Sequence, residues 1–315
     1  MFEGKEFSLD TVLASLDQLR IPYRVSTPHS ERGYSFKSLR EIGDYGIFFF
    51  VGGFKNKPLI KNSIILCVEN DYGCEGNITI AVEDPQLVFY KLSALLLTDK
   101  KKKSGIHETA IVDPNAIISP DAYIGPYCVV ENCEIKSGVR LHSHVTIMSG
   151  TTIEEDVVVE PHSTIGATGV AWIWDPETRE RVIQPQTGYT LIGRGSFLGS
   201  DISVVRGSIN ESTVIGRGCV IAHGSKIGHG AKVGDECHFA NNVSIAGNVT
   251  LGNQCFLGSG AVVRPQTKLA ECTVVGAGAV VVKDCEEKGC LLMGVPAKRS
   301  TPDQTRLSGV PKQLD

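Results

Sequence analysis

Residues 215–280 decide the fold, because they divide into groups of six that share one pattern: IGRGCV, IAHGSK, IGHGAK, VGDECH, FANNVS, IAGNVT, LGNQCF, LGSGAV, VRPQTK, LAECTV and VGAGAV. The first residue of each group is bulky and apolar, and the fifth is mostly small. A period of six matches neither the helix period of about 3.6 nor the two-residue alternation of a strand. It is typical of a three-sided coil of about 18 residues with one short strand per side, and such coils bury their apolar side chains only by stacking into a solenoid.

The repeat extends well beyond this stretch and contains one long interruption. It begins near Ile106, breaks at residues 167–190, and slips once more before Ile215. The interruption contains both tryptophans, Trp172 and Trp174. We expect it to form a loop at one edge of the solenoid, where binding faces often lie. A neutral surface insertion is the alternative.

The chain divides into a part without the repeat and a part with it. We expect residues 1–103 to form a small α/β domain, 104–299 to form the solenoid, and 300–315 to be a flexible tail. The lysine run 100–103 is predicted to be a solvated linker. Within the first domain the apolar spacing predicts helices over 8–19 and 85–98, and strands over 45–51, 63–68 and 77–82.

Composition excludes several classes of function. The net charge is −4, which gives no support to nucleic-acid binding. The chain shows no signal-peptide layout and no apolar run of membrane-spanning length, so we expect a cytoplasmic location. The ten cysteines show no zinc-finger spacing, and four of them occupy the small fifth position of a hexad. They are therefore predicted to be reduced and buried.

Two histidines and one glycine carry the chemistry. His223 and His229 each occupy the third position of a hexad, which can point outward. Gly247 follows His229 by 18 residues, so it is predicted to lie beside that histidine on the next coil. A neutral imidazole can act as a general base, and a glycine amide can donate to an oxyanion. This pair, without a Ser or Cys nucleophile, favours direct acyl transfer from a thioester to an amine or hydroxyl.

The chain resembles the hexapeptide-repeat acyltransferases and, among them, the UDP-3-O-acylglucosamine N-acyltransferases of lipid A synthesis. The resemblance runs over about residues 8–299. It is carried by Gly46–Lys55, the interruption at 165–193, Arg206-Gly207, Ile227-Gly-His-Gly230 and Ile245-Ala-Gly-Asn248. It implies a left-handed parallel β-helix, so that the chain is mostly β with a small N-terminal α/β domain, and it implies a homotrimer.

The resemblance also assigns residues to roles. It implies that His229 is the catalytic base and Gly247 the oxyanion donor, with no metal and no bound cofactor. Substrate-binding residues are predicted to be Phe49 or Phe54 for the nucleotide base, together with His223, Lys226, Trp172 and Arg206. Residues that would bind the acyl donor are Gln266, Gly276, Gly278 and Lys283.

This chain departs from that family at the positions that handle the sugar and its lipid. It has Ala222-His223 where the family has Asp-Asn, Lys226 where it has Gln, and Gln266 where it has a second His. An acidic residue of the family corresponds to Val205. The C-terminal segments 275–283 and 294–298 look instead like the ends of acetyl-CoA-dependent sugar acetyltransferases. These departures favour a relative that acts on another nucleotide-linked amino sugar.

We therefore expect an N-acyltransferase that moves an acyl group from acyl-CoA or acyl carrier protein to the amine of a nucleotide-linked amino sugar, in lipopolysaccharide or surface-polysaccharide synthesis. The lipid A enzyme itself is the alternative. A β-helix metal hydratase, which needs three converging imidazoles, and a non-catalytic scaffold are alternatives of other classes. The sequence leaves open the sugar, the nucleotide base, the acyl length, the donor, and whether His223 shares or replaces the role of His229.

Overall fold

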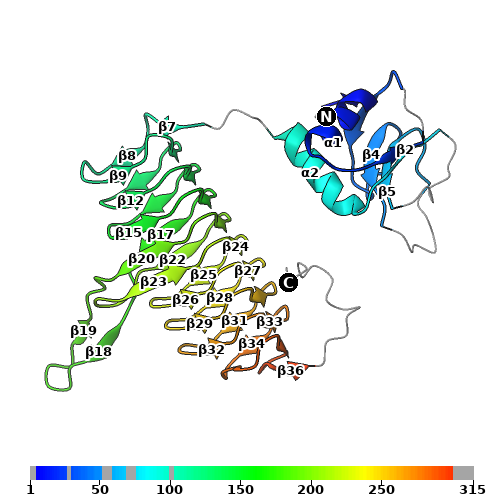
Figure 1. Ribbon diagram of the computed structural model, residues 1–315. Helices are drawn as coiled ribbons and strands as arrows, with labels where there is room; N and C mark the ends of the chain where they lie inside the picture. Colours follow the sequence, from blue (N-terminus) through cyan, green and yellow to red (C-terminus); the bar gives the residue numbers. More distant parts are fainter. Residues whose placement is uncertain (1–4, 27–29, 52–58, 69–75, 99–102, 301–315) are drawn as a thin grey trace. The chain divides into compact units, whose positions relative to one another are not determined.

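The computed structural model describes residues 5–26, 30–51, 59–68, 76–98 and 103–300. The chain divides into two compact units, Met1–Lys102 and Lys103–Asp315, and Figure 1 labels their elements. This division lies one residue from the boundary that the sequence predicts. Most of lysine run 100–103 and residues 301–315, predicted to be a linker and a flexible tail, lie outside the described residues. In the described part of the chain, no helix has both the length and the apolar character that crossing a bilayer requires.

The N-terminal unit is a six-stranded sheet with two helices against one face. The strand order is β1-β3-β4-β5-β6-β2. Both helices begin at a capping side chain, because Ser8 accepts from Thr11 N and Asp84 accepts from Leu87 N. The elements are β1 (Phe7–Ser8), α1 (Leu9–Gln18), β2 (Arg24–Val25), β3 (Gly33–Phe36), β4 (Gly46–Phe49), β5 (Ile64–Cys67), β6 (Ile78–Ala81) and α2 (Pro85–Leu97). The expected helices and strands are present, and β1, β2 and β3 are additional because they are short or only partly apolar.

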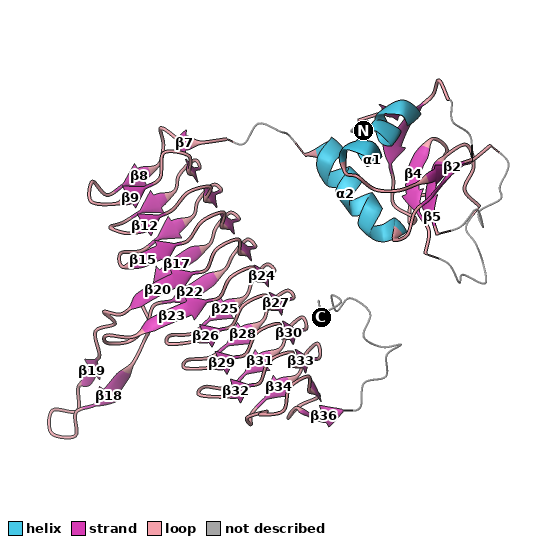
Figure 2. Cartoon of the chain, viewed as in Figure 1, coloured by secondary structure: helices cyan, strands magenta, loops and turns pink. Residues whose placement is uncertain are grey.

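The second unit is a three-sided left-handed parallel β-helix, as predicted. Figure 2 shows its short strands stacked in register along the solenoid. The first face consists of β7 (Gly105–Ile106), β10 (Tyr123–Ile124), β13 (Arg140–Leu141), β16 (Val158–Val159), β21 (Phe197–Leu198), β24 (Val220–Ile221), β27 (His238–Phe239), β30 (Phe256–Leu257), β33 (Val274–Val275), β35 (Leu291–Met293) and β36 (Lys298–Ser300).

The other two faces complete each coil. The second face consists of β8 (Ile111–Val112), β11 (Val129–Val130), β14 (Thr146–Ile147), β17 (Thr164–Ala167), β22 (Ser203–Val205), β25 (Lys226–Ile227), β28 (Ser244–Ile245), β31 (Val262–Val263) and β34 (Val280–Val281). The third face consists of β9 (Ile117–Ile118), β12 (Glu134–Ile135), β15 (Thr151–Ile153), β20 (Tyr189–Ile192), β23 (Ser212–Ile215), β26 (Lys232–Val233), β29 (Thr250–Leu251) and β32 (Lys268–Leu269).

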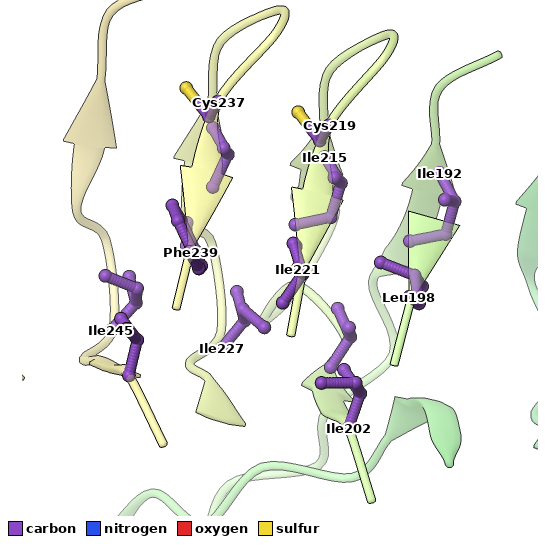
Figure 3. Close-up of a cluster of buried hydrophobic side chains, with 14 of the residues drawn as sticks. Ile192, Leu198, Ile202, Ile215, Cys219, Ile221, Ile227, Cys237, Phe239 and Ile245 are labelled. Atoms are coloured by element: carbon purple, nitrogen blue, oxygen red, sulfur yellow. The ribbon is translucent and has the colours of Figure 1, made fainter. Parts of the chain in front are cut away.

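The hexad pattern forms the solenoid core. Every first-position residue from Ile215 to Val281 is at most 3% exposed. Equivalent residues lie directly above one another, so that Ile221 pairs with Phe239 on the next coil, as Figure 3 shows. Nine of the ten cysteines are described, and all nine are buried free thiols, as predicted. Hydrogen bonds with the thiols of Cys219 and Cys255, followed by burial, raise the pKa of Cys237.

The long interruption forms a projecting β-hairpin. Its strands β18 (Trp172–Trp174) and β19 (Arg181–Ile183) pair antiparallel, and Figure 1 shows them standing away from the coils. Trp172 and Trp174 are 44% and 58% exposed, and the Arg181 guanidinium lies over both rings. The hexad pattern ends near Val281, but β35 adds one further strand to the first face, by pairing with β33.

Candidate functional site

One edge of the solenoid gathers most of the residues that the sequence singles out. We call it the 2–3 edge; it consists of the turns between the second and third faces. The hairpin leaves the solenoid here, between β17 and β20, and the slip in the repeat is a turn here, between β22 and β23. On the following coils the same edge carries His229, Gly247, Gln266 and Lys283. The edge follows from counting, because residues 18 apart occupy equivalent turns.

His229 and Gly247 are in direct contact, as predicted. His229 lies in the turn between β25 and β26, and its carbonyl accepts from Asn248 N at 2.7 Å, which aligns the two coils. A Cβ on Gly247 would lie 2.5 Å from His229 Nε2, so that only glycine leaves room for the imidazole in this position. The ring therefore lies against the Gly247 backbone.

The polar atoms of this pair are available for chemistry. The His229 Nδ1 atom is buried and has no hydrogen-bond partner among the described residues. The Gly247 N–H makes no hydrogen bond within the described part of the chain, whereas its carbonyl accepts from Gln266 N at 3.0 Å. A ring nitrogen and an unused amide that are side by side can serve one reacting carbonyl as base and oxyanion donor.

Gln266 and Lys283 continue the same edge beyond the pair. Both side chains are exposed, and they follow Gly247 on the next two coils. A ligand that ran along this edge from His229 would pass them in order. Their predicted role in binding the acyl donor stays a prediction, and their shared edge is compatible with it.

The structure does not bring His223 to this place. His223 lies in a turn between the first and second faces, which we call the 1–2 edge, while β25 separates it from His229. Its Nδ1 accepts from Ser200 N at 2.8 Å, which fixes the exposed ring. Gly276 and Gly278 also lie on the 1–2 edge. Within one chain the predicted donor-binding and substrate-binding residues are thus divided between two edges.

Lys226 and Arg206 already have partners. The Lys226 ammonium lies on the second face and forms an exposed ion pair with Asp201 at 3.0 Å. The Arg206 guanidinium donates to the carbonyls of Gly166 and Ser149 at 2.9 and 2.8 Å. It therefore ties the turn that contains the slip to the preceding coils. This contact favours a structural contribution by Arg206 beside its predicted role in substrate binding.

Two residues at the 2–3 edge escaped the sequence interpretation. Glu211 and Asn248 both direct side-chain oxygens toward Gly230, the residue after His229. The signal was present for Glu211, because it precedes His229 by 18 residues and β23 pairs with β26. For Asn248 the signal was its position directly after Gly247.

In the N-terminal unit, Phe49 lies on the opposite face of the sheet from its neighbours. Phe48 and Phe50 are buried in a separate small cluster. Phe49 is partly buried against α2, with its ring 5.1 Å from that of Phe89 and 6.4 Å from that of the exposed Tyr90. Phe54, the other predicted stacking residue, lies outside the described residues.

Metal ligands do not cluster in the part of the chain that the structure describes. No group of three or more His, Cys, Asp or Glu side chains there is arranged to hold an ion. His223, His229 and His238 lie on two different edges and on a strand of the first face. The three imidazoles that a β-helix hydratase requires do not converge within this chain.

Comparison with known proteins agrees with the repeat and with the edge geometry. A family model of the bacterial transferase hexapeptide, six repeats, matches residues 212–247, the stretch that contains both His229 and Gly247. The solenoid carries the bacterial transferase hexapeptide repeat. Curated relatives are the UDP-3-O-acylglucosamine N-acyltransferases of Coxiella burnetii, 30% identical, and of Hydrogenovibrio crunogenus, 36% identical, each over 159 residues.

These matches cover part of each protein. They include 44% of this chain, against the residues 8–299 over which the motifs resemble the family, and 46% and 45% of the two relatives. The chain thus spans about half the length of the curated relatives that it matches. Solved structures with the same fold include LpxA from Acinetobacter baumannii, 28% identical with a TM-score of 0.57, over 62% of this chain and 73% of that one.

A second solved structure is the UDP-N-acetylglucosamine O-acyltransferase of Moraxella catarrhalis. It is 28% identical with a TM-score of 0.57, over 64% of this chain and 75% of that one. The named relatives and this neighbour are all acyltransferases, of an amine in the first case and of a hydroxyl in the second. Their shared chemistry is acyl transfer to a UDP-linked sugar.

Proposed function

We propose that this protein is an acyltransferase that moves an acyl group from a thioester to the amine of a nucleotide-linked amino sugar. The observation that carries the proposal is the contact between His229 and Gly247 on the 2–3 edge. The names of the relatives support a UDP-linked sugar and a place in lipid A or related polysaccharide synthesis. Either acyl-CoA or acyl carrier protein fits the role of donor.

The proposed reaction needs only these two groups and the substrates. The His229 Nε2 takes a proton from the attacking amine as its nitrogen bonds to the thioester carbonyl carbon. The Gly247 N–H stabilises the oxyanion that forms. When the tetrahedral intermediate collapses, the carbon–sulfur bond breaks and the thiolate leaves with the proton that His229 carries. The products are an amide and a free thiol, so no metal or bound cofactor takes part.

The lipid A enzyme itself, acting on UDP-3-O-acylglucosamine, is the second candidate. The relatives' names favour it. Ala222, His223, Lys226 and Gln266 disfavour it, because they differ from the family at the positions that handle the glucosamine and its lipid. We therefore place another nucleotide-linked amino sugar first.

The test is a matrix of thiol-release assays. Acyl-CoAs of short and medium chain length and the corresponding acyl carrier proteins are combined with UDP- and dTDP-amino sugars and with UDP-3-O-acylglucosamine. We expect thiol release in at least one combination, with the acylated sugar identified by mass spectrometry. Release with UDP-3-O-acylglucosamine alone would establish the second candidate. Absence of release in every combination would favour a non-catalytic scaffold and overturn the proposal.

A further inference from the structure

Three polar side chains meet around Gly230, directly beside the candidate base. If Gly230 carried a Cβ, the Asn248 Oδ1 atom would lie 2.0 Å from it and the Glu211 Oε1 atom 2.5 Å from it. Both oxygens therefore occupy space that a side chain at residue 230 would fill. Gly230 also adopts a φ of 64°, which glycine tolerates best. The turn is built so that these side chains can approach His229.

The groups at this point have unused hydrogen-bonding capacity. The His229 Nδ1 and Asn248 Oδ1 atoms are both buried and lack partners among the described residues. One Glu211 oxygen, Oε2, accepts from Ser208 N at 3.1 Å, which holds the carboxylate in place. The other, Oε1, makes no hydrogen bond within the described part of the chain. A buried ring nitrogen without a partner costs free energy, so an acceptor close by is stabilising.

Glu211 differs from the other acidic residue of this edge in where its carboxylate points. Glu131 accepts with Oε2 from Ser149 N and Oγ on the next coil, at 2.8 and 2.9 Å. Glu211 holds an equivalent position one coil before His229, but its carboxylate caps its own turn at Ser208 and keeps one oxygen free. This free oxygen lies beside the residue that follows the candidate base.

We propose that Glu211 is a positioning residue for His229, whose free Oε1 holds the proton on Nδ1. A small rotation of the carboxylate or one bridging water joins the two atoms. The hydrogen bond would select the tautomer with Nε2 unprotonated and would stabilise the imidazolium that forms during reaction. This inference rests on the proposed function for its catalytic meaning.

The test compares Glu211→Gln with the matched control Glu131→Gln, which removes a carboxylate from the same edge, two coils before the hairpin. Glu211→Gln should lower kcat by about tenfold or more and leave KM unchanged, because the base loses its fixed tautomer. The loss of the carboxylate lowers the pKa of the imidazolium, so the acidic limb of the rate profile should move to lower pH. Glu131→Gln should change neither kcat nor the profile.

A spectroscopic readout separates this inference from the proposed function. The ring nitrogen shifts of His229, assigned from their loss in His229→Ala, should show the Nδ1–H tautomer in the natural protein and a shift toward Nε2–H in Glu211→Gln. A tautomer that ignores Glu211→Gln overturns the inference even if acyl transfer is demonstrated. So does a shift that follows Asn248→Ala alone.

The reverse outcome is equally distinct. If no donor releases thiol but the tautomer follows Glu211, the proposed function fails and the pair of Glu211 and His229 stands. Circular dichroism checks the fold of each variant. If Glu211→Gln does not fold, Glu211→Asp takes its place, since the shorter carboxylate keeps the charge and should give a mixture of tautomers. An unchanged tautomer in folded Glu211→Asp then overturns the inference.

Discussion

At the scale of the residue, His229 is defined by what surrounds its two ring nitrogens. One is buried without a partner and the other lies against Gly247. We predict that His229→Ala lowers turnover about 10²–10⁴-fold, the usual contribution of a general base. The measurement is steady-state thiol release on a protein of unchanged circular dichroism. His223→Ala is the comparison, and a larger loss there would transfer the role of base to His223.

Gly247 makes a second prediction at this scale. In Gly247→Ala the new methyl group would lie 2.5 Å from Nε2, so the imidazole must move away from the reacting carbonyl. We expect turnover to fall about as far as in His229→Ala. In the His229→Ala background no ring remains to be displaced, and Gly247→Ala should add little further loss. Additive losses in the double variant would show that Gly247 does not act through the histidine.

Phe49 tests the nucleotide site of the N-terminal unit. Stacking of a base on an aromatic ring contributes about 1–3 kcal/mol, so Phe49→Leu should raise the KM for the nucleotide sugar about tenfold or more. Leucine is chosen because it keeps apolar contact with Phe89. An unchanged KM, with turnover also unchanged, would assign Phe49 to the core alone. Tyr90→Leu then tests the exposed ring beside it.

At the scale of the element, the solenoid coil protects its thiols. The nine described cysteines are buried, and burial together with the Glu131 and Asp113 carboxylates raises the pKa of Cys133 to about 12. Because the thiolate is the reactive form, we predict that iodoacetamide at pH 8 leaves these nine unmodified in the folded protein and labels them in denaturant. Peptide mapping is the measurement. Labelling of Cys237 under native conditions would contradict the buried column.

The sequence predicts the elements best where the coil constrains them most. Counting 18 residues places Gly247 beside His229, because stacked parallel strands keep equivalent turns in line. The same count places His223 on a different edge from His229, although both share a position in the hexad. The pairing within the hairpin was not predictable, since the interruption carries no repeat and its strands rest on no coil. The Glu211 carboxylate depends on a hydrogen bond inside its own turn, which spacing does not reveal.

At the scale of the whole molecule, the candidate residues lie on two edges of one prism. His229, Gly247, Gln266 and Lys283 lie on the 2–3 edge, and His223, Gly276 and Gly278 on the 1–2 edge. One substrate pair can contact both sets if the 2–3 edge of one chain faces the 1–2 edge of another. We therefore predict a homotrimer with its sites between subunits, measured by sedimentation equilibrium.

Mixing makes this prediction sharper. If His223 of one chain serves the His229 of its neighbour, His229→Ala and His223→Ala chains refolded together should regain activity that neither has alone. Each variant refolded alone is the control. A monomer, or a trimer in which mixed chains stay inactive while both single variants are impaired, would contradict sites shared between subunits.

Since His229 and Gly247 are one coil apart, the rise between neighbouring strands, about 4.8 Å, sets their spacing whatever the length of the chain. A gene duplication that adds a whole coil ahead of the hairpin lengthens the prism and leaves the pair intact. One residue gained between the two turns moves Gly247 off the edge and turns core side chains outward. Evolution can therefore change the size of this protein only in whole rungs, or at turns such as the one from which the hairpin grows.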